Sequence, residues 1–173
     1  MKVHRVVTHS AIETRTVGRT VGAVLEAGDV VLLAGGLGAG KTQFAKGIAD
    51  GLGVTEPVVS PTFTIAREYE GRVGMVHVDV YRLDHAQEVL DLGLDEAGDD
   101  VVTVVEWGDV AGAYLPADRL EIRLEIPVVA LPDAAPPGGV PDRPDDRVVT
   151  ITTVGAAWQT RAERLGAVLG PVS

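Results

Sequence analysis

The stretch LAGGLGAGKTQFAKGIADGLG, from Leu33 to Gly53, decides how this chain of 173 residues folds. Seven of its 21 residues are glycine, namely Gly35, Gly36, Gly38, Gly40, Gly47, Gly51 and Gly53. Glycine loses more backbone freedom on folding than any other residue, so a packed core gains nothing from such a run. We interpret the first part of the stretch, with Gly35, Gly38 and Gly40, as a loop whose backbone approaches a phosphate closely, and the part after Gly40 as a helix.

The loop matches a complete phosphate-binding motif, because Gly35 to Thr42 follow the P-loop pattern G-x-x-x-x-G-K-[ST]. Backbone N–H groups would turn inward to form an anion nest, and the helix that begins near Gly40 would aim its positive end at the same anion. Lys41 is expected to reach the β- and γ-phosphates, and the Thr42 hydroxyl is expected to bind Mg²⁺. The predicted nucleotide-binding residues of the loop and the next helical turn are Gly38, Ala39, Gly40, Lys41, Thr42 and Gln43.

The segments on either side of the motif have the expected character. The apolar run Asp29–Gly35 has the length of a strand, and the segment after the loop carries apolar side chains at the helical spacing of Phe44, Ile48 and Leu52. A glycine-rich strand-to-helix turn without a ligand is the alternative. The combination of strand, complete motif and helix favours the phosphate site.

Composition and charge restrict the class of protein. Hydrophobic residues make up 46% of the chain and charged residues 23%, which is typical of a globular fold, and we expect residues 1–173 to form one domain. The net charge of −10 disfavours broad contact with RNA or DNA. The absence of cysteine excludes disulfides and thiol chemistry. Without a signal peptide or an apolar run of membrane-spanning length, a cytoplasmic protein with no membrane contact is expected.

The order of the remaining segments predicts an α/β fold of the P-loop NTPase type, with a central, mostly parallel sheet flanked by helices and an antiparallel C-terminal extension. Strands are expected at 3–7, 29–35, 58–69, 74–80, 100–107, 118–126 and 146–154, with a loop at Ser60-Pro61 inside the third. Helices are expected at 10–25, 41–52, 84–97 and 156–169, the first of them opened by a capping box of Ser10 and Glu13. Residues 127–145, rich in Pro, Gly and Asp, are expected to form a long mobile loop.

Two carboxylates stand where an apolar strand ends. Asp79 ends MVHVD, and Glu106 ends VVTVVE. A buried strand that delivers an acid to the carboxyl edge of a sheet is typical of the Walker-B position in P-loop proteins. Ordinary surface carboxylates are the alternative, because most Asp and Glu side chains are exposed. The predicted catalytic residues are therefore Lys41, Asp79 and Glu106.

The motifs GGLGAGKTQF, SPTF, HVDVYRL and VEWGD, in this order and spacing, resemble the bacterial TsaE (YjeE) ATPase family. Residues 13–18, ETRTVG, resemble the first helix of that family, so the resemblance covers nearly the whole chain. Gly36 departs from the pattern, because family members usually carry an acid there. The loop after Ile126 is also longer than the usual hairpin turn of the family.

The resemblance implies a role for each matching residue. Thr42 and Glu106 match the Mg²⁺ ligands of the family, and Asp79 matches an acid that belongs to a switch or positions water. Trp107 stands beside the metal ligand, and Thr14 falls at a threonine near the nucleotide base.

Two further matches concern loops. The segment Ser60-Pro61-Thr62 matches a switch-like loop of the family. Arg143 is the candidate for an arginine that helps to hold the nucleotide in relatives.

As the resemblance implies, the chain binds ATP and Mg²⁺ and hydrolyses ATP weakly on its own. It would act with the pair TsaB and TsaD, which transfers a threonylcarbamoyl group to adenosine 37 of tRNA, and would meet tRNA only indirectly through that complex. The residues themselves leave other classes open. A GTPase is disfavoured because no N-K-x-D string occurs, whereas a small-molecule or nucleotide kinase and a nucleotide-dependent docking module remain alternatives.

Overall fold

The computed structural model describes residues 1–59, 66–80, 99–107, 116–129, 140–141 and 145–169. The predicted helix at 84–97, the predicted loop at Ser60-Pro61 and most of the predicted loop at 127–145 lie outside these ranges. Among the described residues, no helix is both long enough and apolar enough to span a membrane.

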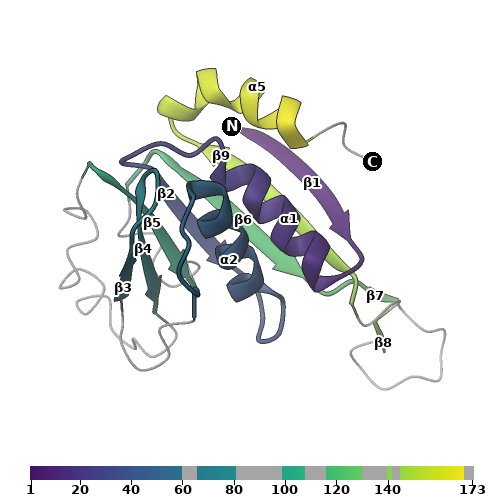
Figure 1. Ribbon diagram of the computed structural model, residues 1–173. Coiled ribbons are helices and arrows are strands. Elements are labelled where there is room, and N and C mark those ends of the chain that lie inside the picture. Colours follow the sequence, from purple (N-terminus) through teal and green to yellow (C-terminus); the bar gives the residue numbers. More distant parts are fainter. Residues whose placement is uncertain (60–65, 81–98, 108–115, 130–139, 142–144, 170–173) are drawn as a thin grey trace.

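A mixed seven-stranded sheet forms the centre of the described structure, in the order β1-β9-β6-β2-β5-β4-β3 (Figure 1). Its strands are β1 (Lys2–Thr8), β2 (Val30–Ala34), β3 (Ala66–Tyr69), β4 (Gly74–Asp79), β5 (Val101–Glu106), β6 (Arg119–Glu125) and β9 (Arg147–Val154). The short strands β7 (Val128–Val129) and β8 (Val140–Pro141) pair separately.

The pairing confirms the predicted parallel centre and antiparallel C-terminal extension. Strands β6, β2, β5 and β4 run parallel to one another, so their carboxyl ends meet at one edge. Strand β9 pairs antiparallel with β6, and β1 extends this antiparallel part to the edge of the sheet. At the other edge, β3 pairs antiparallel with β4.

Within the described ranges, three helices cover the sheet: α1 (Ala11–Gly22), α2 (Lys41–Leu52) and α5 (Ala157–Leu169). Figure 1 shows α1 and α2 side by side over one face, and α5 contributes Trp158 and Leu165 to the same apolar core. The predicted capping box opens α1, because Ser10 Oγ accepts from the Glu13 N–H at 3.1 Å. The Glu13 carboxylate accepts in turn from the N–H of His9 at 2.8 Å, one residue before the cap.

The interface of α1 and α2 explains the glycines that lie within the predicted helix 41–52. Gly47 and Gly51 lie inside α2, and a Cβ on either would collide with a backbone carbonyl of α1, that of Arg15 or of Arg19. These glycines therefore serve close packing of two helices rather than a phosphate, and only the residues before α2 form the loop. Glycines four positions apart in a helix let two backbones approach closely, which the sequence prediction did not anticipate.

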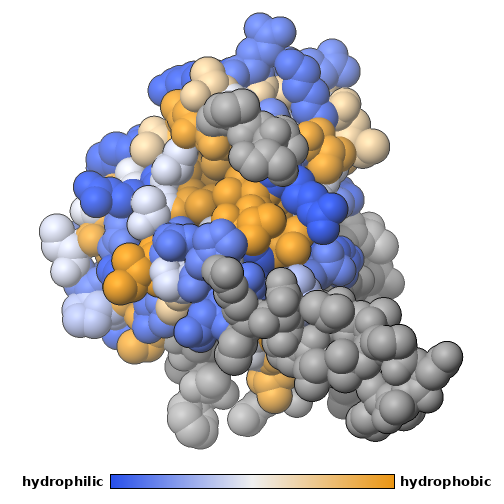
Figure 2. Space-filling view, turned by 90° about the vertical axis from the view of Figure 1, so that its right-hand side faces the viewer, coloured by the Kyte–Doolittle hydropathy of each residue, from blue (hydrophilic) through white to orange (hydrophobic). Residues whose placement is uncertain are grey.

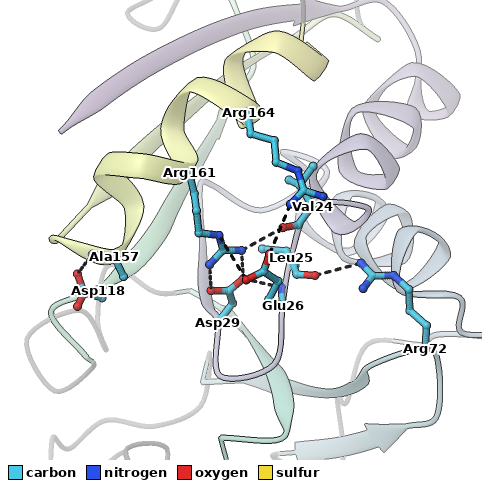
Figure 3. Close-up of polar contacts among 9 residues, drawn as sticks. All are labelled: Val24, Leu25, Glu26, Asp29, Arg72, Asp118, Ala157, Arg161 and Arg164. Atoms are coloured by element: carbon cyan, nitrogen blue, oxygen red, sulfur yellow. Dashed lines mark hydrogen bonds and ion pairs between the residues drawn. The ribbon is translucent and has the colours of Figure 1, made fainter.

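An arginine network joins α5 to the connection between α1 and β2 (Figure 3). Arg161 binds both carboxylate oxygens of Asp29 at 2.7 Å and donates to the carbonyl of Val24 at 3.0 Å. These hydrogen bonds to Asp29 raise the pKa of Arg161 above its ordinary value. From the other side, Arg72 donates to the carbonyl of Leu25 at 3.0 Å. The network holds the chain just before β2, the strand that leads into the P-loop.

The edge strand β1 leaves apolar side chains in contact with solvent. Val3 and Val7 of β1 and Val168 of α5 are about half exposed. The side of the molecule on which β1 and the end of α5 lie shows an apolar area framed by hydrophilic residues (Figure 2).

Candidate nucleotide-binding site

The loop from Gly35 to Gly40 joins β2 to α2 with an unusual backbone. Gly38 and Gly40 take φ angles of +75° and +104°, in the left-handed region that other residues rarely adopt. Nothing lies within 4 Å of the place that a Cβ on Gly38 would occupy, so the space beside this residue is open. The helix starts at once, with the N–H of Phe44 bonded to the carbonyl of Gly40 at 2.9 Å. This geometry suits an anion nest at a helix N-terminus.

Lys41 lies against this loop. The residue is only 5% exposed, and its Nζ donates to the carbonyl oxygens of Gly35 at 2.7 Å and Gly36 at 3.0 Å. The ammonium also lies 3.6 Å from the centroid of the Trp107 ring, within cation–π distance. The lysine is therefore held beside the nest by groups of the loop itself and by the residue that follows β5.

Thr42 and Glu106 meet directly, although 64 positions separate them. Thr42 Oγ1 donates to Oε2 of Glu106 at 3.2 Å, and the carboxylate is 3% exposed. Strand β5 pairs with β2, which leads into the P-loop, and this pairing brings the end of β5 beside the start of α2. The arrangement joins one hydroxyl and one carboxylate at the carboxyl edge of the parallel strands.

The pair Thr42 and Glu106 fits a magnesium ion chemically. Mg²⁺ prefers hard oxygen ligands in an octahedron with bonds of about 2.0–2.1 Å, so two adjacent ligands lie about 2.9 Å apart. The observed 3.2 Å between Oγ1 and Oε2 is close to that spacing. Within the described ranges, no cluster of three or more His, Asp or Glu side chains suited to a metal is found. Proteins usually supply only one or two oxygen ligands to Mg²⁺, and phosphate and water occupy the remaining coordination positions.

Asp79 lies at the same edge as Glu106. It ends β4, and the register of the parallel strands pairs it directly with Glu106. Residues paired in this way point to the same face of the sheet, so both carboxylates are directed toward the face covered by α2.

The remaining predicted positions divide into two groups. Thr14 is buried beside the loop, where its methyl group would contact a Cβ on Gly40 at 3.7 Å. Its hydroxyl is hydrogen-bonded to the hydroxyl of Thr8 and donates to the backbone carbonyl of Ser10. Gln43 lies half-buried in the first turn of α2. Arg143 lies outside the described residues.

Trp107 has a backbone conformation that the sequence did not reveal. Its φ of +64° is the single positive value among the described residues other than glycine. A bulky side chain in this region indicates strain, which concentrates at functional sites. The indole of this residue is the ring that lies against the ammonium of Lys41.

Two residues of the site were missed by the sequence analysis. Arg147, the first residue of β9, donates to the carbonyl oxygens of Gly38 and Ala39 at 3.1 Å each. His77, on β4, lies 3.0 Å from Oε1 of Glu106 through its Nε2. The signal for His77 was its position two residues before Asp79, which puts it on the same strand face. No local pattern pointed to Arg147.

This chain is a P-loop NTPase-like protein. Its α/β fold has a mixed sheet, a glycine-rich loop that leads into a helix, a lysine bound to that loop, and a carboxylate at the end of a neighbouring strand.

Comparison with known proteins shows which family this chain resembles. The family model "Threonylcarbamoyl adenosine biosynthesis protein TsaE" matches residues 8–128. The tRNA threonylcarbamoyladenosine biosynthesis protein TsaE of Treponema pallidum is 44% identical over 70% of this chain and 91% of its own, and that of Bacillus subtilis is 39% identical over 88% and 87%. The crystal structure of Bacillus subtilis YdiB superposes with a TM-score of 0.77 at 34% identity, covering 98% of this chain and 97% of that one. The chain belongs to the TsaE family of tRNA threonylcarbamoyladenosine biosynthesis.

Proposed function

We propose that this protein is a Mg²⁺-dependent ATPase that acts with the TsaB–TsaD pair in the N6-threonylcarbamoyladenosine modification of adenosine 37 of tRNA. The observation that carries the enzymatic part is the contact between Thr42 and Glu106 at the open end of the P-loop, beside Lys41. Membership of the TsaE family supports the pathway.

The chain's own groups account for binding and orientation of the triphosphate. The N–H groups of Gly38 and Gly40 and those at the start of α2 would bind the phosphate oxygens, and Lys41 would leave its carbonyl partners to contact the β- and γ-phosphates. Thr42 and Glu106 would hold Mg²⁺, which supplies charge neutralisation between the two phosphates. Asp79, on the strand next to Glu106, would position the water whose oxygen forms the new bond to the γ-phosphorus as the bond to ADP breaks.

Low activity of the isolated chain follows from its charges. Among the described basic residues, Lys41 and Arg147 contact the P-loop, and Arg147 contacts it through the carbonyl oxygens of Gly38 and Ala39. Phosphoryl transfer gains much of its rate from further positive charge, often from a partner's arginine or an ordered loop. We therefore infer that TsaB–TsaD raises the rate by completing the site.

The division of labour suits the net charge of −10. A strongly acidic chain is repelled by the tRNA backbone, so the partners rather than this chain would hold tRNA.

Steady-state phosphate release from ATP, with and without TsaB–TsaD, tests the proposal. We expect a slow basal rate, a clear rise with the pair, and loss of that rise in Glu106→Ala and Asp79→Ala. Equal rates with and without the pair would contradict it. Transfer of the γ-phosphate to a small-molecule or nucleotide acceptor rather than to water would indicate a kinase instead.

A further inference from the structure

His77 is a buried side chain of this site to which the proposed reaction gives no role. It is 0% exposed, and its Nε2 lies 3.0 Å from Oε1 of Glu106. Because an ionised carboxylate only accepts hydrogen bonds, Nε2 carries the hydrogen and donates it.

Packing alone does not account for an imidazole at this position. The residues beside His77 on the same face of the sheet, Met75 on β4 and Val104 on β5, belong to the apolar core. The Nδ1 atom of His77 is buried without a hydrogen-bond partner in the described structure, and an unpaired buried polar atom destabilises a fold. An aliphatic side chain would fill the space without this cost, so the favourable contribution of His77 must come from Nε2.

The two oxygens of Glu106 have separate partners. Oε1 accepts from His77, whereas Oε2 accepts from Thr42. A carboxylate whose rear oxygen is bonded cannot rotate freely about its last torsion. The carboxylate is therefore held with one oxygen directed at Thr42 and the other at His77.

We propose that His77 is a positioning residue that orients Glu106 for the divalent cation, an inference that rests on the Mg²⁺-dependent ATPase proposed above. Mg²⁺ tolerates little departure from octahedral geometry, so a freely rotating carboxylate binds it less well. Hydrogen bonds behind a metal-binding group typically change metal affinity by about 10- to 100-fold. His77 acts through Glu106 and does not itself touch the nucleotide.

Three substitutions separate the hydrogen bond from the volume of the ring. His77→Leu removes the donor at similar size. His77→Gln places an amide N–H where Nε2 stands, whereas the amide of His77→Asn is one bond too short to reach Oε1 of Glu106.

The readout is the affinity for a fluorescent ATP analogue, measured with saturating Mg²⁺ and again with EDTA. The ratio of the two dissociation constants is the coupling between nucleotide and Mg²⁺. We expect His77→Leu and His77→Asn to lower this coupling about 10-fold or more. The affinity in EDTA should stay within about twofold in all variants, and His77→Gln should keep most of the coupling.

A double-mutant cycle tests whether His77 changes the coupling between nucleotide and Mg²⁺ through the carboxylate of Glu106. In a Glu106→Ala background, His77→Leu should cause no further loss of coupling, because the group that it orients is gone.

Unchanged coupling in His77→Leu, or equal losses in His77→Gln and His77→Asn, would overturn the positioning role alone. Equal weakening with Mg²⁺ and with EDTA would also overturn it, since that pattern indicates a purely structural residue. If His77→Leu does not fold, the comparison of His77→Gln with His77→Asn still tests whether the hydrogen bond to Glu106 matters. If the wild-type protein binds the nucleotide equally well with Mg²⁺ and with EDTA, the proposed function is overturned as well. This measurement on the wild-type protein comes before any variant is tested.

Discussion

The Nζ atom of Lys41 lies 3.6 Å from the centroid of the Trp107 ring while it donates to the carbonyl oxygens of Gly35 and Gly36. The indole belongs to a residue with a left-handed backbone that directly follows Glu106. An anion that draws the ammonium into the glycine nest must therefore change the surroundings of the indole.

This relationship makes Trp107 a reporter of nucleotide binding. The other tryptophan, Trp158, is buried on α5 with the guanidinium of Arg161 4.2 Å from its ring centroid. Adding ATP and Mg²⁺ should therefore change the emission of Trp158→Phe, in which Trp107 remains, and leave that of Trp107→Phe unaltered. The reverse result would show that the end of β5 does not lie at the nucleotide.

Lys41→Ala should weaken ATP binding about 100-fold, because it removes charge-assisted contacts to two phosphates. Lys46, one turn later on α2, is the matched control, since Lys46→Ala changes the net charge equally. Titration calorimetry with a non-hydrolysable ATP analogue measures both. Comparable affinities in the two variants would mean that only the net charge matters and that Lys41 has no specific contact.

Neighbouring glycines of the loop should respond differently to a methyl group. A Cβ on Gly35 would collide with the carbonyl of Leu124 at a φ of +142°, whereas nothing lies within 4 Å of a Cβ on Gly36. Gly35→Ala should lower the free energy of unfolding by about 2 kcal/mol or more, and Gly36→Ala by at most about 0.5 kcal/mol. Urea denaturation measures both values. If Gly36→Ala proved as harmful as Gly35→Ala, the described loop geometry would be wrong.

Arg147 should hold the P-loop in its binding shape. Loss of the two hydrogen bonds to Gly38 and Ala39 in Arg147→Ala should speed amide hydrogen exchange in residues 36–40 and weaken nucleotide binding about 10-fold. The exposed Arg123 of β6 supplies a control of equal charge. Unaltered exchange in Arg147→Ala would show that the loop keeps its shape without this side chain.

The pair Arg161 and Asp29 should contribute measurably to stability. Both side chains are mostly buried, with 21% and 9% exposure, and they share two hydrogen bonds. Arg161→Ala should lower the free energy of unfolding by about 2 kcal/mol, because the carboxylate would be left without its partner. Arg164, which is 62% exposed and 3.5 Å from Glu26, should cost less than about 0.5 kcal/mol on replacement by alanine.

Thermal or urea unfolding of the two arginine variants checks this expectation. Equal losses in Arg161→Ala and Arg164→Ala would indicate that the network in Figure 3 acts only through general surface charge.

Much of the fold could be predicted because its signals are local. Residues 35–42 act through their own backbone, so the contiguous motif was enough to predict the loop and the start of α2. The apolar runs of β4 and β5 showed where each buried strand ends, which predicted the common edge of Asp79 and Glu106. The predicted roles of these residues in phosphoryl chemistry remain predictions.

Local reasoning said less about the glycines of α2. Gly47 and Gly51 fall within the predicted helix 41–52, but no local pattern indicated why glycine stands at these positions. Their function is visible only when the backbone of α1 lies against them.

The sequence by itself determined which contiguous segment can bind a phosphate and which strands end in an acid. Hydrophobic periodicity and sequence motifs involve only residues that are close together along the chain, so both can be recognised without the tertiary structure. Only the tertiary structure decided which distant side chains complete the site. Arg147 reaches the P-loop from 108 positions away, and His77 stands behind Glu106 from 29 positions away. Hydrogen bonds of this kind depend on strand register and helix packing, which are set by the burial of the whole apolar core rather than by any local pattern.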